Sequence, residues 1–290
     1  MLSSGLELTA AVTNPDRRAG RGLRGRPSPV KAAAQAAGIR VLQPQSIKDP
    51  SFQGVVRALR PEVCIVVAYG KILPPTLLEV PDMGFINVHF SLLPAYRGAA
   101  PVQRALMDGA TETGVSIMRI TEGMDEGPVL AARKVAVSPA DSSASLGERL
   151  AADGGDLLIP TVLGYASGAV KPQPQDDRAA TYAPKISEAE TRIDWSKPHH
   201  VIHNLVRGLE PAPGAWTTFR GKRIKIRAVA DVGEEAPALA PGELLAGDLL
   251  LVGTRGDPLE VSVAQSEGKR AMSGAELARG LRLEPSEAFG

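Results

Sequence analysis

The feature that most constrains the fold is an alternation of short apolar runs with helical patterns over the first part of the sequence. Several of the apolar runs are β-branched and apolar on both faces, which is typical of parallel strands covered by helices. The predicted strands are residues 6–12, 39–42, 63–68, 85–89 and 115–120. The predicted helices are residues 28–37, 52–59, 101–107 and 145–165. This order predicts an α/β domain with a doubly wound, mostly parallel, Rossmann-like sheet over residues 1–170.

The sequence changes character near Gly168. Residues 171–186 open with a polar stretch broken by prolines, and we interpret them as a linker. A short helix is predicted at residues 200–209, and alternating apolar runs separated by glycine-containing turns follow it. Residues 187–290 are therefore predicted to form a small antiparallel barrel or sandwich.

Composition limits the class of protein. The 290 residues are 43% hydrophobic and 22% charged, enough for packed cores in two domains. The net charge of +1 argues against a uniformly basic surface, so any RNA contact must come from local clusters. The one cysteine, Cys64, lies in an apolar run and is predicted to be a buried strand thiol. No membrane-length apolar stretch or signal peptide is visible, so we expect a soluble, cytoplasmic protein.

The densest group of chemically capable residues follows the predicted strand at residues 85–89. Asn87 and His89 are two positions apart, so they face the same side of a strand, at the end where α/β sheets bind ligands. An amide donor beside an imidazole suits a reaction that passes through a tetrahedral oxyanion. Asp125 lies on a downstream loop between two glycines, where it could orient His89 or help to accept a proton. Singly, such residues are more often structural, but together they predict a catalytic site.

The run from Asn87 to Pro101 resembles the signature of the folate-dependent formyltransferases, with Asn-x-His, Ser-Leu-Leu-Pro and an Arg-Gly turn. Within that superfamily the similarity is to the enzymes that act on methionyl-tRNA, and it extends to residues 14–22, 27–31, 67–70 and 192–195. The resemblance implies an α/β catalytic domain followed by a barrel of the oligonucleotide-binding (OB) type. It also implies transfer of a formyl group from 10-formyltetrahydrofolate to the α-amino group of methionine on initiator tRNA, for translation initiation, without a metal.

The same resemblance assigns roles to individual positions. The catalytic residues would be Asn87, His89 and Asp125. The folate-binding loop would consist of Ser91, Leu92, Leu93 and Pro94. The partners would be formyl folate and methionine-charged initiator tRNA, and we expect a monomer because no sustained apolar face is left over.

Residues 16–31 carry six basic side chains against one acid, Asp16. Interleaved glycines and prolines disfavour a helix and let the backbone approach another chain closely. Clustered cations attract phosphates, although a solvated basic loop is the alternative. In the family this loop contacts the acceptor end of tRNA. The predicted RNA-binding residues are therefore Arg17, Arg18, Arg21, Arg24 and, in the linker, Lys185.

Further basic residues recur at positions 220–227, where alternation by two would place Arg223, Lys225 and Arg227 on one strand face. RNA contact and a solvated strand face are equally compatible with that pattern. Three histidines, His199, His200 and His203, lie where a helix is predicted to begin, without cysteines or patterned carboxylates nearby. We interpret them as exposed helix residues and not as metal ligands.

The sequence departs from the family at its start. The family opens with a strand, a Gly-Thr-Pro loop and a helix. This unit of roughly two dozen residues has no counterpart here. We hypothesise a start codon placed too late, which the intact mass of the native protein would test; a genuine short form of weak activity is the alternative. Two other functions stay open: a formyltransferase for a small amine, such as a sugar nucleotide or glycinamide ribotide, and an inactive RNA-binding protein.

Overall fold

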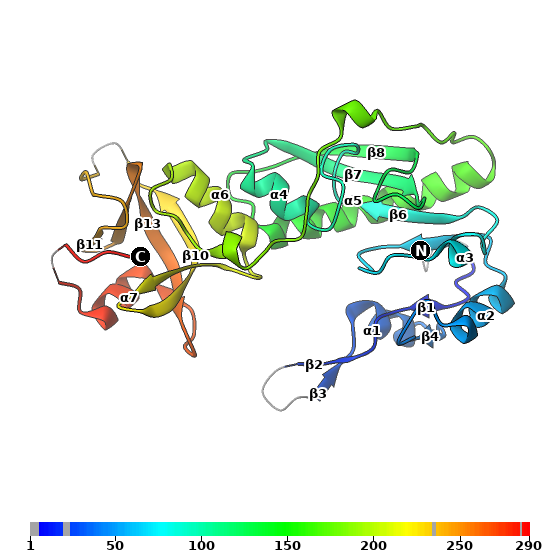
Figure 1. Cartoon of the computed structure of the whole chain (residues 1–290), viewed down its shortest axis with the longest axis horizontal. Coiled ribbons are helices and arrows are strands. Elements are labelled where there is room, and N and C mark those ends of the chain that lie inside the picture. Colours follow the sequence, from blue (N-terminus) through cyan, green and yellow to red (C-terminus); the bar gives the residue numbers. More distant parts are fainter. Residues whose placement is uncertain (1–5, 20–23, 234–235, 285) are drawn as a thin grey trace. The chain divides into compact units, whose positions relative to one another are not determined.

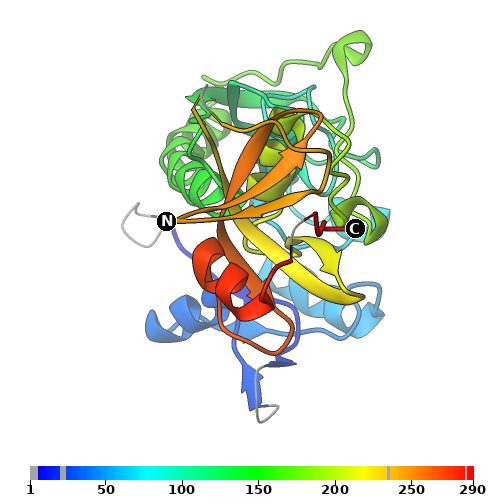
Figure 2. The ribbon, with the colours of Figure 1, turned by 90° about the vertical axis from the view of Figure 1, so that its left-hand side faces the viewer.

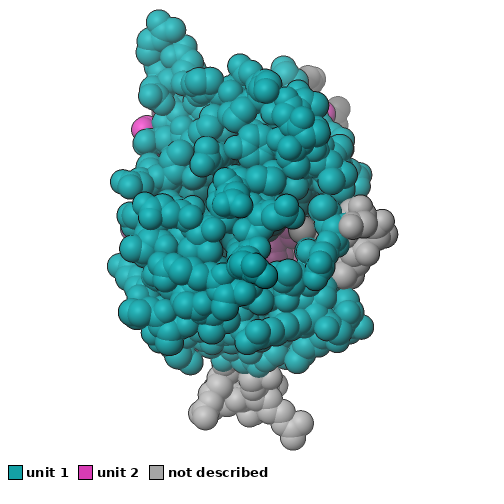
Figure 3. All heavy atoms as spheres, turned by 90° about the vertical axis from the view of Figure 1, so that its right-hand side faces the viewer, with its two compact units in different colours: residues 1–97, 114–134, 151–181 teal, residues 98–113, 135–150, 182–290 magenta. Residues whose placement is uncertain are grey.

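The computed structural model describes residues 6–19, 24–233, 236–284 and 286–290, and it divides into two compact units (Figure 3). Unit 1 comprises residues 1–97, 114–134 and 151–181, and unit 2 comprises residues 98–113, 135–150 and 182–290. The chain passes between the units several times. The division of the sequence at residues 171–186 into two domains and a linker stays a prediction.

Unit 1 contains two strand ladders and a hairpin (Figure 1). The elements are β1 (Ala11–Val12) and β4 (Val41–Leu42) in the first ladder, β5 (Cys64–Val66), β6 (Phe85–His89), β7 (Glu112–Arg119) and β8 (Val129–Ala136) in the second, and β2 (Arg17–Ala19) and β3 (Arg24–Arg26) in the hairpin. β1–β4 and β5–β6 are parallel pairs, and β6–β7 is antiparallel. No pairing among the described residues joins the two ladders.

Two helices of this part of the chain begin where the sequence provides a capping side chain. α1 (Pro29–Ala36) follows Ser28, whose side chain accepts a hydrogen bond from the Lys31 N–H, and α2 (Pro50–Leu59) follows Asp49, which caps Ser51 in the same way. The remaining helices are α3 (Pro75–Leu78) and the long α5 (Ser143–Ala166).

Helix α5 runs along the second ladder (Figure 1). A Cβ on Gly154 would lie 2.7 Å from the Val88 side chain, so the glycine permits this close packing of helix on sheet. Elsewhere in unit 1, Phe52, Leu77 and Phe85 are buried in a hydrophobic cluster that α2, α3 and strands of both ladders contribute to. The predicted α/β class is thereby confirmed.

Unit 2 is built on a six-stranded antiparallel sheet with the order β11-β12-β13-β10-β9, and β14 pairs with β13 (Figure 2). Its strands are β9 (Ala215–Phe219), β10 (Lys222–Asp231), β11 (Leu244–Ala246), β12 (Leu250–Thr254), β13 (Gly256–Ser266) and β14 (Met272–Ser273). The register of β10 against β13 shifts between Ile226 and Val229, and such bulges increase bending and twist. The result is a curled antiparallel sheet, which is consistent with the OB-like barrel predicted for this part of the chain.

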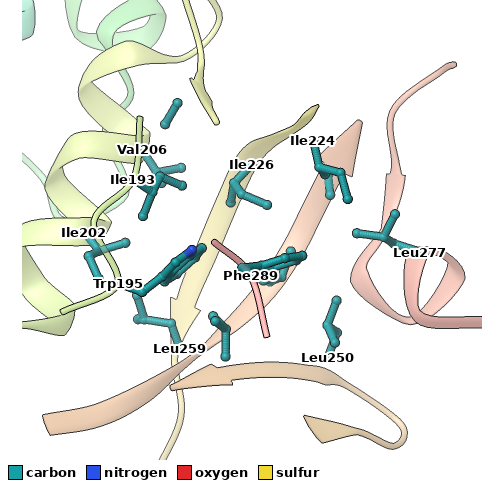
Figure 4. Close-up of a cluster of buried hydrophobic side chains, with 14 of the residues drawn as sticks. Ile193, Trp195, Ile202, Val206, Ile224, Ile226, Leu250, Leu259, Leu277 and Phe289 are labelled. Carbon is teal, nitrogen blue, oxygen red and sulfur yellow. The ribbon is translucent and has the colours of Figure 1, made fainter. Parts of the chain in front are cut away.

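α6 (His199–Leu209) and α7 (Gly274–Leu281) pack on this sheet, and α4 (Pro101–Met107) packs on α6. Two 3₁₀ turns complete the element list, η1 (Asp177–Ala179) in unit 1 and η2 (Ala189–Thr191) in unit 2. In the core of unit 2, the ring of Trp195 stacks on Phe289 at a centroid distance of 5.7 Å, and Phe219 meets Phe289 edge-on (Figure 4). Aromatic pairs of this geometry stabilise beyond their buried area.

Two predicted elements are confirmed to the residue, the strand at 85–89 and the helix at 101–107. The predicted strand at residues 6–12 is wrong in length, because only Ala11–Val12 pair and their partner β4 is itself two residues long. No helix within the described residues is long and apolar enough to cross a bilayer.

Candidate active site

β6 fixes the backbone of the two residues singled out at its end. The strand lies between β5 and β7, with Asn87 opposite Val66 on one side and Met118 on the other. The His89 side chain is 5% exposed and that of Asn87 is partly exposed. A strand that is paired on both edges therefore holds the backbone of both residues in place.

Both ring nitrogens of His89 face polar partners. Nε2 lies 2.9 Å from the carbonyl oxygen of Tyr96, and Nδ1 lies 3.6 Å from a carboxylate oxygen of Asp125. A carbonyl only accepts hydrogen bonds, so Nε2 carries a proton here and donates it. Nδ1 is thereby directed at the Asp125 carboxylate, which is 20% exposed.

The loop that carries Asp125 is strained and tightly packed. Asp125 has φ of +54°, a left-handed conformation that few non-glycine residues adopt. Two residues later, a Cβ on Gly127 would lie 1.8 Å from the Arg119 carbonyl oxygen, so only glycine fits. Conformations of this kind persist where the surroundings determine them, and they concentrate at functional sites.

The predicted folate loop begins directly after β6 and is shaped by two serines. Ser91 donates its hydroxyl hydrogen to the Ala95 carbonyl at 2.5 Å. Ser116, on β7, donates to the Ser91 carbonyl at 2.8 Å and accepts from the Leu93 N–H at 3.0 Å. The Ser91 hydroxyl is thus used within the loop, whereas Leu92, Leu93 and Pro94 are partly exposed.

Two polar residues that the sequence analysis did not select lie beside this site. Arg97 is 2% exposed, and its guanidinium donates to the Gln175 side-chain oxygen and to Asp177. Gln175 in turn donates to backbone carbonyls of the Asp125 loop. Arg97 lies in the Arg-Gly turn of the family signature, so the sequence did indicate that it belongs near the site. Gln175 lies in a stretch that the sequence presents as a polar linker, and nothing in the local pattern indicated its role.

The predicted RNA-binding residues are placed as follows. Arg17 and Arg18 lie in β2 and Arg24 lies in β3, where Arg17 pairs with Arg26 across the hairpin. Arg21 lies outside the described residues. Lys185 is exposed and belongs to unit 2.

The cations of β10, which the sequence left open as RNA contacts, are engaged within unit 2. Arg223 pairs with Glu188 at 3.3 Å, Arg227 pairs with Glu210, and Lys225 donates to the Pro213 carbonyl at 2.9 Å. These contacts favour a structural role for that strand face.

Two other candidates carry little chemistry. Burial raises the pKa of the Cys64 thiol to about 11, so it is not a thiolate at neutral pH. Within the ranges that the structure describes, no group of three or more His, Cys, Asp or Glu side chains could hold a metal ion.

Comparison with known sequences matches the chain in two segments. Residues 3–162 match the family described as "Formyl transferase", and residues 185–282 match "Formyl transferase, C-terminal domain". The chain is 44% identical to the methionyl-tRNA formyltransferase of Thermobifida fusca, over 100% of this chain and 94% of that protein. It is 46% identical to the methionyl-tRNA formyltransferase of Streptomyces coelicolor, over 98% of this chain and 92% of the relative.

Solved structures agree in fold. HypX from Aquifex aeolicus in complex with tetrahydrofolic acid matches with a TM-score of 0.66 at 18% identity, over 88% of this chain and 45% of HypX. The N-formyltransferase from Helicobacter canadensis, in complex with folinic acid and dTDP-3-aminofucose, matches with a TM-score of 0.63 at 16% identity, over 88% and 87% of the two chains. Because both segments of the family match and relatives above 40% identity cover nearly the whole chain, this protein belongs to the formyl transferase family.

Proposed function

We propose that this chain is a methionyl-tRNA formyltransferase, which transfers the formyl group of 10-formyltetrahydrofolate to the α-amino group of methionine on initiator tRNA. The observation that carries the proposal is the full-length identity above 40% to relatives that bear that name. In the reaction the formyl carbon gains a bond to the methionine nitrogen and loses its bond to the folate nitrogen. One proton leaves the amine and one is taken up by the departing folate nitrogen.

The catalytic residues in this proposal are Asn87, His89 and Asp125. The Asn87 amide, partly exposed at the end of β6, would donate to the oxyanion that forms when the amine attacks. His89 would add a second donor through Nδ1 when that nitrogen is protonated, because Nε2 is engaged by the Tyr96 carbonyl. Asp125, 3.6 Å from Nδ1, would hold the ring in the productive orientation. The proximity of Asp125 to His89 across 36 positions of sequence supports a shared role.

The folate-binding residues in this proposal are Ser91, Leu92, Leu93 and Pro94. The last three offer partly exposed apolar surface next to His89, which suits a flat heteroaromatic ring. The internal bonds of Ser91 and Ser116 hold the loop in shape, so little order would have to be gained on binding. Formyl folate would supply the activated formyl carbon at this loop.

The tRNA contacts in this proposal are Arg17, Arg18, Arg21, Arg24 and Lys185. The first four belong to the basic segment of residues 16–31, whose charge suits phosphates. The base of that segment is anchored, because Lys31 donates to Asp16 at 2.7 Å and to Gln43 at 2.8 Å. Gln43 closes the ring by donating to the other Asp16 oxygen at 2.8 Å.

The test is formyl transfer from 10-formyltetrahydrofolate to methionine-charged initiator tRNA, with increasing uncharged tRNA as competitor. We expect turnover that the competitor inhibits. Transfer to a free sugar-nucleotide amine that tRNA does not inhibit would replace the proposal with the small-amine function. Tight binding of charged tRNA without turnover would replace it with an RNA-binding function.

A further inference from the structure

A chain of polar contacts leads from a buried arginine to the loop that carries Asp125. Arg97 donates to the Gln175 side-chain oxygen from Nε at 3.1 Å and from Nη2 at 2.9 Å. The amide nitrogen of Gln175 then donates to the carbonyls of Asp125 at 2.8 Å and Gly127 at 2.7 Å. Every polar atom of the Gln175 amide is therefore engaged, with the guanidinium on one side and the loop on the other.

Arg97 fixes which way the Gln175 amide faces. A guanidinium has only donors, so the group that faces it must be the amide oxygen. The two loop carbonyls only accept, so the group that faces them must be the amide nitrogen. If the amide were flipped, its N–H groups would face the N–H groups of Arg97, and its oxygen would face the two loop carbonyl oxygens. Only one orientation of the amide is therefore stable.

The same segment of chain also holds the partner of the other imidazole nitrogen. Tyr96, whose carbonyl accepts from His89 Nε2, donates its N–H to the Thr181 hydroxyl at 2.8 Å. The Arg97 N–H donates to the Thr181 carbonyl at 2.9 Å. Residues 175–181 thus support the groups that meet both ring nitrogens of His89.

We propose that Gln175, oriented by the buried guanidinium of Arg97, is a positioning residue that holds Asp125 against His89 for catalysis. The inference rests on the proposed function of the Asn87–His89–Asp125 site and deepens it. It makes the stretch that the sequence presented as a linker part of the catalytic apparatus. The bonds from Gln175 to the carbonyls of Asp125 and Gly127 hold the loop in the conformation in which Asp125 has φ of +54°.

Two substitutions of Gln175 separate positioning from folding. Gln175→Ala removes both halves of the contact and leaves the buried guanidinium with less to satisfy it. Gln175→Glu keeps an acceptor for Arg97 but loses the donor to the loop, so the buried charge stays compensated. The matched control is Gln173→Ala, because the Gln173 side chain is exposed. Within the part of the chain that the structure describes, its amide donates only to the Lys171 carbonyl.

We expect kcat for formyl transfer to fall about 100-fold in both Gln175 variants, since small misplacements of a catalytic group have effects of that order. KM for formyl folate and for tRNA should change less than about threefold, and Gln173→Ala should match the wild type. When Gln175→Ala is added to Asp125→Ala, kcat should fall by less than about threefold relative to Asp125→Ala alone, because the group that Gln175 positions is already absent. Full kcat in Gln175→Glu, or an undiminished loss in the Asp125→Ala background, would overturn the inference.

A second readout does not depend on turnover. The chain has four histidines, so the ¹⁵N spectrum of histidine-labelled protein is simple, and His89→Asn identifies the His89 signals. We expect the His89 ring signals to shift in Gln175→Glu and to stay unchanged in Gln173→Ala. If the wild type transfers no formyl group, the proposed function fails while this spectrum still decides the inference, and unshifted His89 signals would overturn it.

Discussion

Two buried regions of the protein, the end of β6 in unit 1 and the central cluster of unit 2, differ in how their side chains are held. Around the end of β6 several of the buried residues are polar, among them His89, Arg97 and Ser116, and each has hydrogen-bond partners. The large cluster at the centre of unit 2 is apolar, with Trp195 and Phe289 in its middle (Figure 4). Hydrogen bonds are directional and apolar contacts are not, so the first arrangement fixes the direction of groups and the second mainly supplies stability.

This contrast predicts opposite responses to substitution. Changes around the end of β6 should alter turnover more than stability, whereas changes in the core of unit 2 should alter stability more than turnover. Equal losses of both properties in either place would remove the distinction.

The largest effect is expected for His89→Ala and Asn87→Ala. Loss of a proton-transfer group or of an oxyanion donor lowers turnover by roughly 100- to 10,000-fold. We therefore expect kcat on methionine-charged tRNA to fall by about 1,000-fold while formyl folate affinity, measured by fluorescence titration, changes little. His200→Ala is the control, because His200 is exposed on α6. Unchanged kcat in either variant would remove that residue from the mechanism.

In unit 2, Phe289→Ala should lower the free energy of unfolding by about 3–5 kcal/mol, because it removes a buried ring that packs on Trp195 and Phe219. Urea denaturation followed by Trp fluorescence measures this loss. At temperatures where the variant stays folded, kcat should remain near that of the wild type. Leu245→Ala, an exposed leucine on β11, should change the unfolding free energy by less than about 0.5 kcal/mol. A loss of similar size for both would mean that the aromatic cluster does not dominate stability.

An intermediate effect is expected for Ser116→Ala in unit 1. Ser116 is fully buried and bridges the Ser91 carbonyl and the Leu93 N–H, so its loss leaves buried polar groups unsatisfied at about 1–3 kcal/mol. Because these groups shape the predicted folate loop, KM for formyl folate should also rise severalfold. Ser167→Ala, an exposed serine at the end of α5, should change neither quantity. A stability loss without any change in KM would separate the loop from folate binding.

Local patterns were sufficient to predict much of the fold. Ser28 before Pro29 signalled the start of α1, and the apolar run that ends at His89 gave the bounds of β6 to the residue. β8 was not predicted, because the adjacent Arg133 and Lys134 put a charged side chain on each face of the strand, whereas the predicted strands were runs apolar on both faces. The same period-of-two argument placed Asn87 and His89 on one side of a strand, and the structure brings Asp125 to His89.

The supports of the site could not be predicted in this way. Arg97 and Gln175 are 78 positions apart, and a glutamine among prolines has the same local signal whether it joins domains or orients a loop. The cations of β10 show the same limit, because their acidic partners Glu188 and Glu210 lie in other elements. Contacts between distant polar residues leave no periodicity, so the sequence predicts the reactive groups better than it predicts what holds them.

The smallest expected effect comes from a polar contact at the surface of unit 2. Glu190 accepts from Arg104 and from Ser187, and these bonds lower the pKa of its carboxyl group to about 2. A folded-state pKa below the unfolded value of 4.5 stabilises the protein fully above pH 4.5, and this stabilisation is lost as the pH falls toward 2. The side chain is 37% exposed, so screening by solvent keeps the contribution at or below about 1 kcal/mol. Glu190→Gln should therefore unfold at lower urea than the wild type at pH 7, and the difference should shrink between pH 4.5 and pH 2. If the difference in stability between wild type and Glu190→Gln stayed constant over this range, the charge of Glu190 would contribute nothing.

If that difference at pH 7 were larger than the loss caused by Ser116→Ala, polar contacts would not matter most where they are buried beside β6.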